Sequence, residues 1–346
     1  MNGNFEKETH AGVKEGYLSI EVTTRCNSAC LHCFVRAGKP GRLSLSLEVV
    51  KDIIAEGYDA GYRHLHITGG EPLLWERLLK TLHCAFGRGF ETVFLNTNGT
   101  LLTEGLSNRL AEYPGLSISV SLEGTEAFHD RLRGEGSYMR ASQGIEKALS
   151  AGVGLYLFVL ATRSLVPNLP YFADETYKKF PGIRYLTLIP LARMQDNIVS
   201  LRKELLAPEY FLRLVRAVSL LNLYGLKTDV LNDPLINVVS KLLEMPWIPQ
   251  ARALNRRGSM MVMANRDICL SHPLRNSFGK YAPGMIQKVL SSEPYRKAVA
   301  PDETACPPCK YIERCRDNGL LRPSGYEWGK YNGLPYCRRV LDKVLP

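Results

Sequence analysis

Regular alternation of two hydrophobic periods constrains the fold of this chain more than any other sequence feature. Short apolar runs with strand character occupy residues 17–23, 64–68, 91–96, 116–122, 154–162 and 185–189. Amphipathic segments with helical periodicity follow them, at residues 47–57, 73–86, 103–113, 137–151, 169–180 and 209–224. Strict alternation of this kind indicates parallel strands joined by right-handed crossovers. Six such units cannot close like the eight-unit barrel, so we predict the α/β class with a partial (β/α)6 parallel barrel.

The pattern changes after residue 230. A last strand is expected at 226–231, a helix at 234–244 and a hairpin at 259–270. From Pro301 the chain is rich in Pro, Gly and Cys, and a segment of that composition usually needs a metal or a cross-link to fold. We therefore predict an N-terminal extension at 1–16, a barrel domain at 17–230, a linker at 231–258 and a small C-terminal Cys-rich domain at 259–346.

Charge and hydropathy exclude several functional classes. The 346-residue chain has a formal net charge of +10, yet it contains no block of consecutive Lys and Arg residues. A scattered basic excess is typical of a solvated surface, so we do not expect a nucleic acid partner. No apolar run is long enough for a membrane span. Residues 1–16 lack an apolar signal core, which indicates a cytoplasmic protein.

Three cysteines directly after the first strand form the most specific motif. Cys26, Cys30 and Cys33 follow one another at spacings of four and three residues. Three such thiolates can surround one iron–sulfur cube, for which four cysteines are usual, and the missing ligand leaves one iron open for chemistry. The alternatives are a zinc site completed by His32 or another residue, and three unrelated core cysteines. The end of a strand favours the cluster, because parallel-strand folds bind ligands there.

Polar groups also follow the next three strands. Gly69 and Gly70 allow a backbone to approach a ligand closely, and Glu71 supplies a carboxylate for an ammonium group. Asn98 follows the third strand and Ser121 ends the fourth. On its own, the Gly-Gly-Glu-Pro segment is typical of a turn. With the cysteine triplet one strand upstream, it indicates a cofactor pocket.

The cysteine triplet followed by Gly69-Gly-Glu-Pro72 resembles the radical S-adenosylmethionine superfamily. The resemblance implies a [4Fe–4S] cluster on the triplet, with S-adenosylmethionine bound at its open iron. It further implies contacts with that cofactor: Phe34 and Ile189 near the adenine, Gly69, Gly70 and Glu71 at the methionine ammonium, Asn98 at the strand end, and Ser121 and Arg133 at the methionine carboxylate. The family commonly has Asp where this chain has Glu123, so the chain departs from the pattern there.

A second group of cysteines comprises Cys306, Cys309, Cys315 and Cys337. Four thiolates suit a closed [4Fe–4S] cluster or a structural zinc site. Their spacing resembles the auxiliary-cluster region of the SPASM and twitch subfamilies, and we favour the cluster because the chain already has a redox motif. Cys269 matches the first cysteine of the full pattern, but Gly284 and Gly319 stand where further cysteines are expected. The resemblance therefore implies one auxiliary [4Fe–4S] cluster in a C-terminal iron–sulfur domain, and an orphan Cys269.

Other residues with reactive side chains are interpreted as structural. Cys84 lies on an apolar helical segment and is expected in the core. His64 and His66 lie on a strand without a third ligand or a paired carboxylate nearby in the sequence.

The resemblance implies an enzyme, a radical oxidoreductase or maturase. S-adenosylmethionine would be cleaved reductively to a 5′-deoxyadenosyl radical, which takes a hydrogen atom from the substrate. The electron would come from an external donor such as flavodoxin or ferredoxin. We expect a ribosomally made peptide as substrate, with a separate peptide-recognition protein as a further partner, and a tetrapyrrole of the haem pathway or another small molecule as the alternative. A non-catalytic iron–sulfur or zinc scaffold is the alternative from another class.

Overall fold

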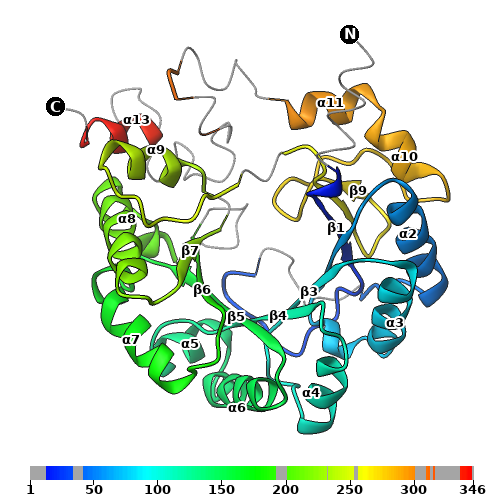
Figure 1. Cartoon of the computed structure of the whole chain (residues 1–346), viewed down its shortest axis with the longest axis horizontal. Helices are drawn as coiled ribbons and strands as arrows, with labels where there is room; N and C mark the ends of the chain where they lie inside the picture. Colours follow the sequence, from blue (N-terminus) through cyan, green and yellow to red (C-terminus); the bar gives the residue numbers. More distant parts are fainter. Residues whose placement is uncertain are drawn as a thin grey trace. The chain divides into compact units, whose positions relative to one another are not determined.

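The computed structural model of the chain describes residues 13–33, 42–191, 201–231, 233–252, 256–300, 309–311, 315 and 336–344. Figure 1 labels the helices and strands and colours the chain from the N-terminus (blue) to the C-terminus (red). The chain divides into two compact units. The first unit comprises Met1–Val120, Met139–Leu155 and Leu254–Ala300. The second comprises Ser121–Tyr138, Tyr156–Ala253 and Pro301–Pro346.

The first unit is built on parallel strands. They are β1 (Tyr17–Glu21), β2 (His64–Thr68), β3 (Thr92–Thr97) and β4 (Leu116–Ser121), and each pairs with the next in parallel. On its other edge β1 pairs in parallel with β8 (Met260–Val262), which forms an antiparallel hairpin with β9 (Ile268–Cys269). The strands and the hairpin expected from the sequence are therefore confirmed, and the hairpin extends the sheet beyond β1.

The helices of the first unit begin and end close to the expected positions. They are α2 (Leu47–Asp59), η1 (Pro72–Leu74), α3 (Leu78–Arg88), α4 (Glu104–Ala111), α6 (Ser137–Ser150), α10 (Met285–Leu290) and α11 (Glu293–Val299). Thr103 caps α4 as expected, accepting a hydrogen bond from the backbone of Leu106. The prediction that Gly57 ends α2 is wrong. Gly57 lies inside the helix, where a Cβ atom would stand 2.2 Å from a methyl carbon of Leu18, so the glycine lets β1 pack against α2.

The two faces of β1 to β4 differ in chemistry. The face toward the helices is apolar and fully buried, and it includes Leu18, Ile20, Leu65, Ile67, Leu95 and Ile118. The opposite face carries polar side chains, among them Ser19, Glu21, His66, Asn96 and Ser119. Closed α/β barrels fill their interior with branched apolar side chains. The polar face in this protein is therefore suited to polar ligands rather than to a dry core.

The second unit repeats the parallel arrangement. Strands β5 (Gly154–Ala161), β6 (Tyr185–Pro190) and β7 (Thr228–Val230) pair in parallel in that order. Its helices are α5 (Glu126–Arg133), η2 (Val166–Asn168), α7 (Leu169–Lys179), α8 (Pro208–Leu223), α9 (Leu235–Leu242) and α13 (Tyr336–Leu341). Helix α5 was not expected from the sequence. Its start is fixed by Thr125, whose hydroxyl accepts from the backbone N–H of Phe128.

These elements confirm the predicted α/β class with an open, mostly parallel sheet of the partial-barrel type. The boundaries proposed for the four domains stay predictions. In the part of the chain that the structure describes, no helix is long and apolar enough to cross a membrane.

Candidate functional site

The loop after β1 places Cys26, Cys30 and Cys33 together, and all three side chains are half-buried. The backbone N–H of Cys33 donates to the carbonyl of Cys30 at 3.1 Å, and the N–H of Ser28 donates to Sγ of Cys26 at 3.4 Å. Burial raises the pKa of Cys26 to about 11, and the charges of Glu71, Cys30 and Cys33 act in the same direction. The thiols are therefore close enough to affect one another, and a bound metal would have to displace their protons.

The chemistry of these side chains fits an iron–sulfur cluster. A [4Fe–4S] cluster is held by cysteine thiolates, and this short loop supplies three half-buried thiols.

Gly69 and Gly70 are required by the cysteine loop itself. A Cβ atom on Gly69 would stand 2.5 Å from the carbonyl oxygen of Thr23, and one on Gly70 would stand 2.3 Å from that of Arg25. Both distances are too short for a real Cβ atom. The close approach lets the N–H of Gly70 donate to Thr23 and that of Glu71 donate to Arg25, each at 2.7 Å. The glycines thus hold the start of the cysteine loop against the end of β2.

Glu71 is fully buried, and its carboxylate joins the ends of β2 and β3. Its Oε1 accepts from the backbone N–H of Leu73 at 3.0 Å and from the hydroxyl of Thr97 at 2.7 Å. Its Oε2 accepts from the N–H of Asn98 at 2.7 Å. The carboxylate expected at the methionine ammonium is therefore also an organising centre of the strand ends.

Asn98 connects the end of β3 to the cysteine loop. Its side-chain amide donates to Oδ1 of Asn27 at 2.8 Å, and its own Oδ1 accepts from the backbone and hydroxyl of Thr100. Asn27 in turn donates to the hydroxyl of Thr100 at 2.9 Å. The sequence singled out Asn98 but not its partners. Asn27 lies between two of the cysteines, and that position is the one signal that could have identified it.

Ser121 and Arg133 belong to the second unit, at the end of β4 and of α5. The guanidinium of Arg133 donates from Nε at 3.0 Å and from Nη2 at 2.7 Å to Oε1 of Glu123, which is buried. The other oxygen of Glu123 accepts from the N–H of Leu160 at 2.7 Å. The position where the chain departs from the family pattern therefore contacts the arginine expected at the cofactor carboxylate.

His129 completes this group. Its Nδ1 accepts from the backbone N–H of Glu123 at 3.0 Å. Burial lowers the pKa of His129 to about 4, and the nearby charge of Arg133 acts in the same direction. The imidazole is therefore neutral at physiological pH and serves as an acceptor.

The structure describes four of the remaining expected site residues and leaves out two. Ile189 lies near the end of β6 and is half-buried. Cys309, Cys315 and Cys337 are half-buried in the second unit. Phe34 and Cys306 lie outside the described residues.

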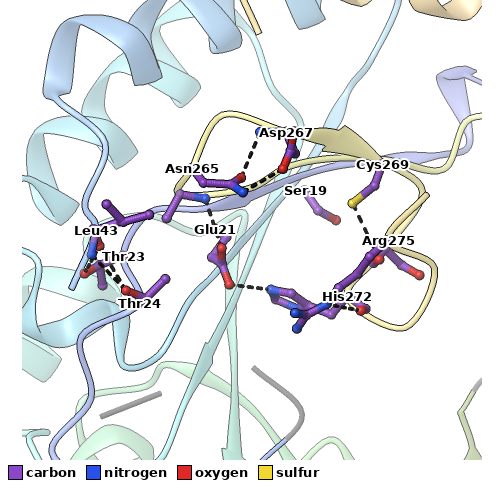
Figure 2. A network of polar contacts seen from close by, with 12 residues as sticks. Ser19, Glu21, Thr23, Thr24, Leu43, Asn265, Asp267, Cys269, His272 and Arg275 are labelled. Carbon is purple, nitrogen blue, oxygen red and sulfur yellow. Dashed lines mark hydrogen bonds and ion pairs between the residues drawn. The ribbon is translucent and has the colours of Figure 1, made fainter. Parts of the chain in front are cut away.

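A buried polar network that sequence reasoning missed lies on the polar face of the first unit (Figure 2). Nε2 of His272 stands 2.9 Å from Oε1 of Glu21, and Oε2 of Glu21 accepts from the N–H of Ala264 at 2.9 Å. Arg275 donates to the carbonyl of His272 at 2.8 Å. Cys269 is fully buried beside this group, and burial raises its pKa to about 12. Hydrogen bonds to Glu21 thus hold the segment after β8 against β1, the strand that leads into the cysteine loop.

A second part of this face carries polar contacts between neighbouring strands among β1 to β4. The hydroxyl of Ser19 lies 3.0 Å from Nδ1 of His66, and the hydroxyl of Ser119 donates to Oδ1 of Asn96 at 2.7 Å. Burial lowers the pKa of His66 to about 4, so this ring is neutral at physiological pH. The interpretation of His66 as a structural residue agrees with these contacts.

Glu21→Gln is expected to reduce the pH dependence of folding. Burial acts to raise the pKa of Glu21, but the hydrogen bond and charge of His272 and the N–H of Ala264 outweigh it and hold the pKa below its ordinary value of 4.5. A lowered pKa contributes stability above the unfolded value, and that stability is lost as the pH falls through the folded pKa. The wild-type protein should be more stable than the variant at neutral pH, by about 1.5–3 kcal/mol.

Urea unfolding of the metal-free protein at neutral pH and at successively lower pH measures this difference. The gap between wild type and Glu21→Gln should narrow on acidification below the ordinary value of 4.5. A gap that stays constant across this range contradicts an ionised Glu21 in the network.

Fold and site together define an α/β protein whose parallel strands carry a loop with three cysteines, and polar residues, at their carboxyl ends. Residues 20–170 match the family model of the Radical SAM superfamily, so this region of the chain is similar to that superfamily.

Two curated relatives each match about half of the chain. The mycofactocin maturase MftC of Mycobacterium tuberculosis is 32% identical over 181 residues, which are 52% of this chain and 46% of the relative. The AdoMet-dependent heme synthase of Oleidesulfovibrio alaskensis is 35% identical over 160 residues, 45% of this chain and 40% of the relative. This chain therefore spans about half the length of these curated relatives.

A solved structure with a similar fold is that of Streptococcus suis SuiB bound to the precursor peptide SuiA. Its TM-score is 0.69 at 16% identity, and the match covers 91% of this chain and 73% of SuiB. At this identity the likeness demonstrates the fold alone, and it extends the fold well beyond residues 20–170.

Proposed function

We propose that this protein is a radical S-adenosylmethionine enzyme that modifies a ribosomally made peptide. The observation that carries the proposal is the cysteine loop. Its three half-buried thiols are held against the end of β2 by Gly69 and Gly70 and tied to the end of β3 through Asn98. When bound there, a [4Fe–4S] cluster supplies the electron that splits S-adenosylmethionine and releases a 5′-deoxyadenosyl radical.

The residues that the family resemblance singles out would each bind a different part of S-adenosylmethionine. We assign the methionine ammonium to Gly69, Gly70 and Glu71, because that segment lies beside the cysteine loop and Glu71 carries a buried negative charge. Asn98 would keep the loop in place. We assign the methionine carboxylate to Ser121 and Arg133, and the adenine to Phe34 and Ile189.

The four C-terminal cysteines would hold one auxiliary [4Fe–4S] cluster in a domain covering residues 259–346. Cys306, Cys309, Cys315 and Cys337 supply the four thiolates that a closed cluster requires. Such a cluster could take up the electron that an oxidised substrate gives away.

Formation of 5′-deoxyadenosine tests the proposed function directly. The protein is reconstituted with iron and sulfide without oxygen, reduced, and incubated with S-adenosylmethionine. Stoichiometric 5′-deoxyadenosine and methionine support a radical S-adenosylmethionine enzyme. Absence of both products would favour a non-catalytic iron–sulfur or zinc scaffold.

The names of similar proteins support two substrate classes. A mycofactocin maturase shares 32% identity over half of this chain, and SuiB shares the fold and binds a precursor peptide. These two favour a peptide. The heme synthase relative favours a tetrapyrrole as the second candidate. A flavodoxin or ferredoxin as electron donor, a separate peptide-recognition protein and a cytoplasmic location complete the proposal.

Glu123→Gln is expected to weaken the binding of S-adenosylmethionine about tenfold, because the buried carboxylate of Glu123 fixes the guanidinium of Arg133 with two hydrogen bonds. The binding of decarboxylated S-adenosylmethionine should change little, since that analogue lacks the group that Arg133 contacts. Equilibrium binding of both ligands to the reconstituted protein makes the comparison.

The conservative variant Glu123→Asp and the neighbouring variant Glu126→Gln serve as controls. Glu126 lies on the first turn of α5 and is exposed, so its variant should bind both ligands as wild type does. An equal loss of both ligands in Glu123→Gln would mean that Glu123 acts only on the local fold.

A further inference from the structure

The face of β5, β6 and β7 opposite the apolar helix-facing side carries a different set of side chains from the polar face of the first unit. Leu157, Leu186 and Leu188 are fully buried on the helix-facing side. The alternate positions point the other way. In register across the three strands these positions include Tyr156, Phe158, Tyr185, Thr187 and Asp229. This face therefore carries three aromatic side chains and one carboxylate.

Asp229 is the unusual member of this set. Thr187, its partner in the strand register, donates a hydrogen bond to its side chain. The other oxygen, Oδ1, is buried and has no hydrogen-bond partner among the residues that the structure describes. Burial raises the pKa of Asp229, although the hydrogen bonds from Thr187 and from its own backbone act in the opposite direction. Burying a carboxylate oxygen without a hydrogen-bond partner lowers the free energy of unfolding. An aspartate at this position is therefore a candidate for a functional role.

A structural role does not supply that reason. The hydrogen bond to Thr187 uses only one carboxylate oxygen, and an asparagine would accept the same bond without burying a charge. An ionisable group whose pKa is shifted by burial is a candidate for a functional site. Asp229 is the central residue of β7, in register with Thr187 on β6.

The neighbouring rings indicate which ligand would fit. Tyr156 and Tyr185 stack with their centroids 6.0 Å apart and their planes at 9°. Tyr185 is two residues before Thr187 on β6 and shares its face, so the stacked pair lies on the same side of the sheet as Asp229. Aromatic faces attract organic cations, and a carboxylate supplies the countercharge. Together they suit an ammonium or guanidinium group on an apolar stem.

We propose that Asp229, with Tyr156 and Tyr185, forms a subsite for a cationic side chain of the substrate, a lysine or an arginine of the peptide. This inference rests on the proposed function, because it names a feature of the peptide that the enzyme accepts. The cation would pair with Oδ1 of Asp229, and its alkyl stem would lie along the tyrosine rings. The peptide would thereby be fixed at one residue on β5 to β7.

The test uses the reconstituted enzyme with S-adenosylmethionine and four probes of known structure. Nα-acetyl-lysine methylamide and Nα-acetyl-arginine methylamide carry the cation. Nα-acetyl-norleucine methylamide and Nα-acetyl-citrulline methylamide have similar stems without it. Calorimetric titration compares wild type with Asp229→Asn and with the matched control Asp174→Asn. Asp174 is on α7 in the same unit, half-exposed and already paired with Lys178.

Wild type and Asp174→Asn should bind at least one cationic probe, and should prefer it over its neutral partner. Asp229→Asn should lose that preference and bind the cationic probe about tenfold more weakly. Thr187→Val removes the hydroxyl that donates a hydrogen bond to the carboxylate. Its affinity for the cationic probe should lie between those of wild type and Asp229→Asn. Thermal unfolding checks the fold, and Asp229→Asn should be at least as stable as wild type because no unpaired charge is buried.

Two results would overturn the subsite. One is a wild-type enzyme that shows no preference for either cationic probe. The other is an Asp229→Asn enzyme that keeps the preference in full. Both are distinct from failure of the proposed function, which appears as a wild-type enzyme that forms no 5′-deoxyadenosine.

Discussion

Replacing Cys26, Cys30 and Cys33 together by Ala should abolish the formation of 5′-deoxyadenosine and still leave about four irons per chain. In the loop after β1, Cys26 lies close enough to Glu71 for its pKa to be affected, and Asn98 donates a hydrogen bond to Asn27 of the same loop, so we assign the catalytic cluster to this loop. The residual iron would belong to the four C-terminal cysteines. Iron, sulfide and zinc analysis after anaerobic reconstitution, together with product analysis by chromatography, measures both effects.

Cys84→Ala is the matched control for the triple variant. Cys84 lies on α3, away from the cysteine loop in the sequence, and its replacement should leave iron content and product formation unchanged. Loss of all iron with about one zinc per chain in the triple variant would assign the C-terminal cysteines to a structural zinc site. Continued 5′-deoxyadenosine formation would contradict the assignment of the catalytic cluster to Cys26, Cys30 and Cys33.

Gly70→Ala is the second substitution for which a large effect is expected. The added Cβ atom would meet the carbonyl oxygen of Arg25 at 2.3 Å and its carbonyl carbon at 2.7 Å, and backbone atoms cannot move aside as a flexible side chain can. The hydrogen bonds from Gly70 to Thr23 and from Glu71 to Arg25 would have to lengthen. We expect the free energy of unfolding to fall by about 1–3 kcal/mol and cluster incorporation to fall with it.

Gly105→Ala provides the control with the same chemical change. Gly105 lies on α4 and a Cβ atom there would meet no atom within 4 Å, so alanine should raise helix stability by about 0.5–1 kcal/mol. Urea unfolding and iron analysis of the two variants should therefore diverge in sign. Full iron incorporation in Gly70→Ala would show that the cysteine loop does not depend on its contact with the end of β2.

Local sequence signals were sufficient for most of the fold because they act over a few residues. The alternation of Leu and Ile with polar residues marks each strand, and Thr103 marks the start of α4 through its hydroxyl. The motif at Gly69 to Glu71 was recognised for the same reason. Its glycines turned out to be required by the protein backbone of the adjacent loop, which no local pattern reveals.

Long-range contacts account for what was missed. Glu21 and His272 are 251 positions apart, so no periodicity or spacing connects them. Gly57 has the sequence signal of a helix end, but packing of Leu18 against it overrides the signal and α2 continues. The partner of Arg133 was similarly hidden, because Glu123 was seen only as a departure from a pattern and not as a carboxylate within reach of α5.

Pairing of β1 with β8 has a consequence for synthesis of the chain on the ribosome. One edge of β1 pairs with β2, which follows within about fifty residues. The other edge pairs with β8, so it stays unpaired until Met260–Val262 has been synthesised. Until then, β1 offers unpaired backbone groups on the strand that leads to Cys26. Exposed strand edges invite pairing with other chains. A nascent chain that stalls before β8 is therefore at greatest risk of aggregation at the strand on which cofactor insertion depends.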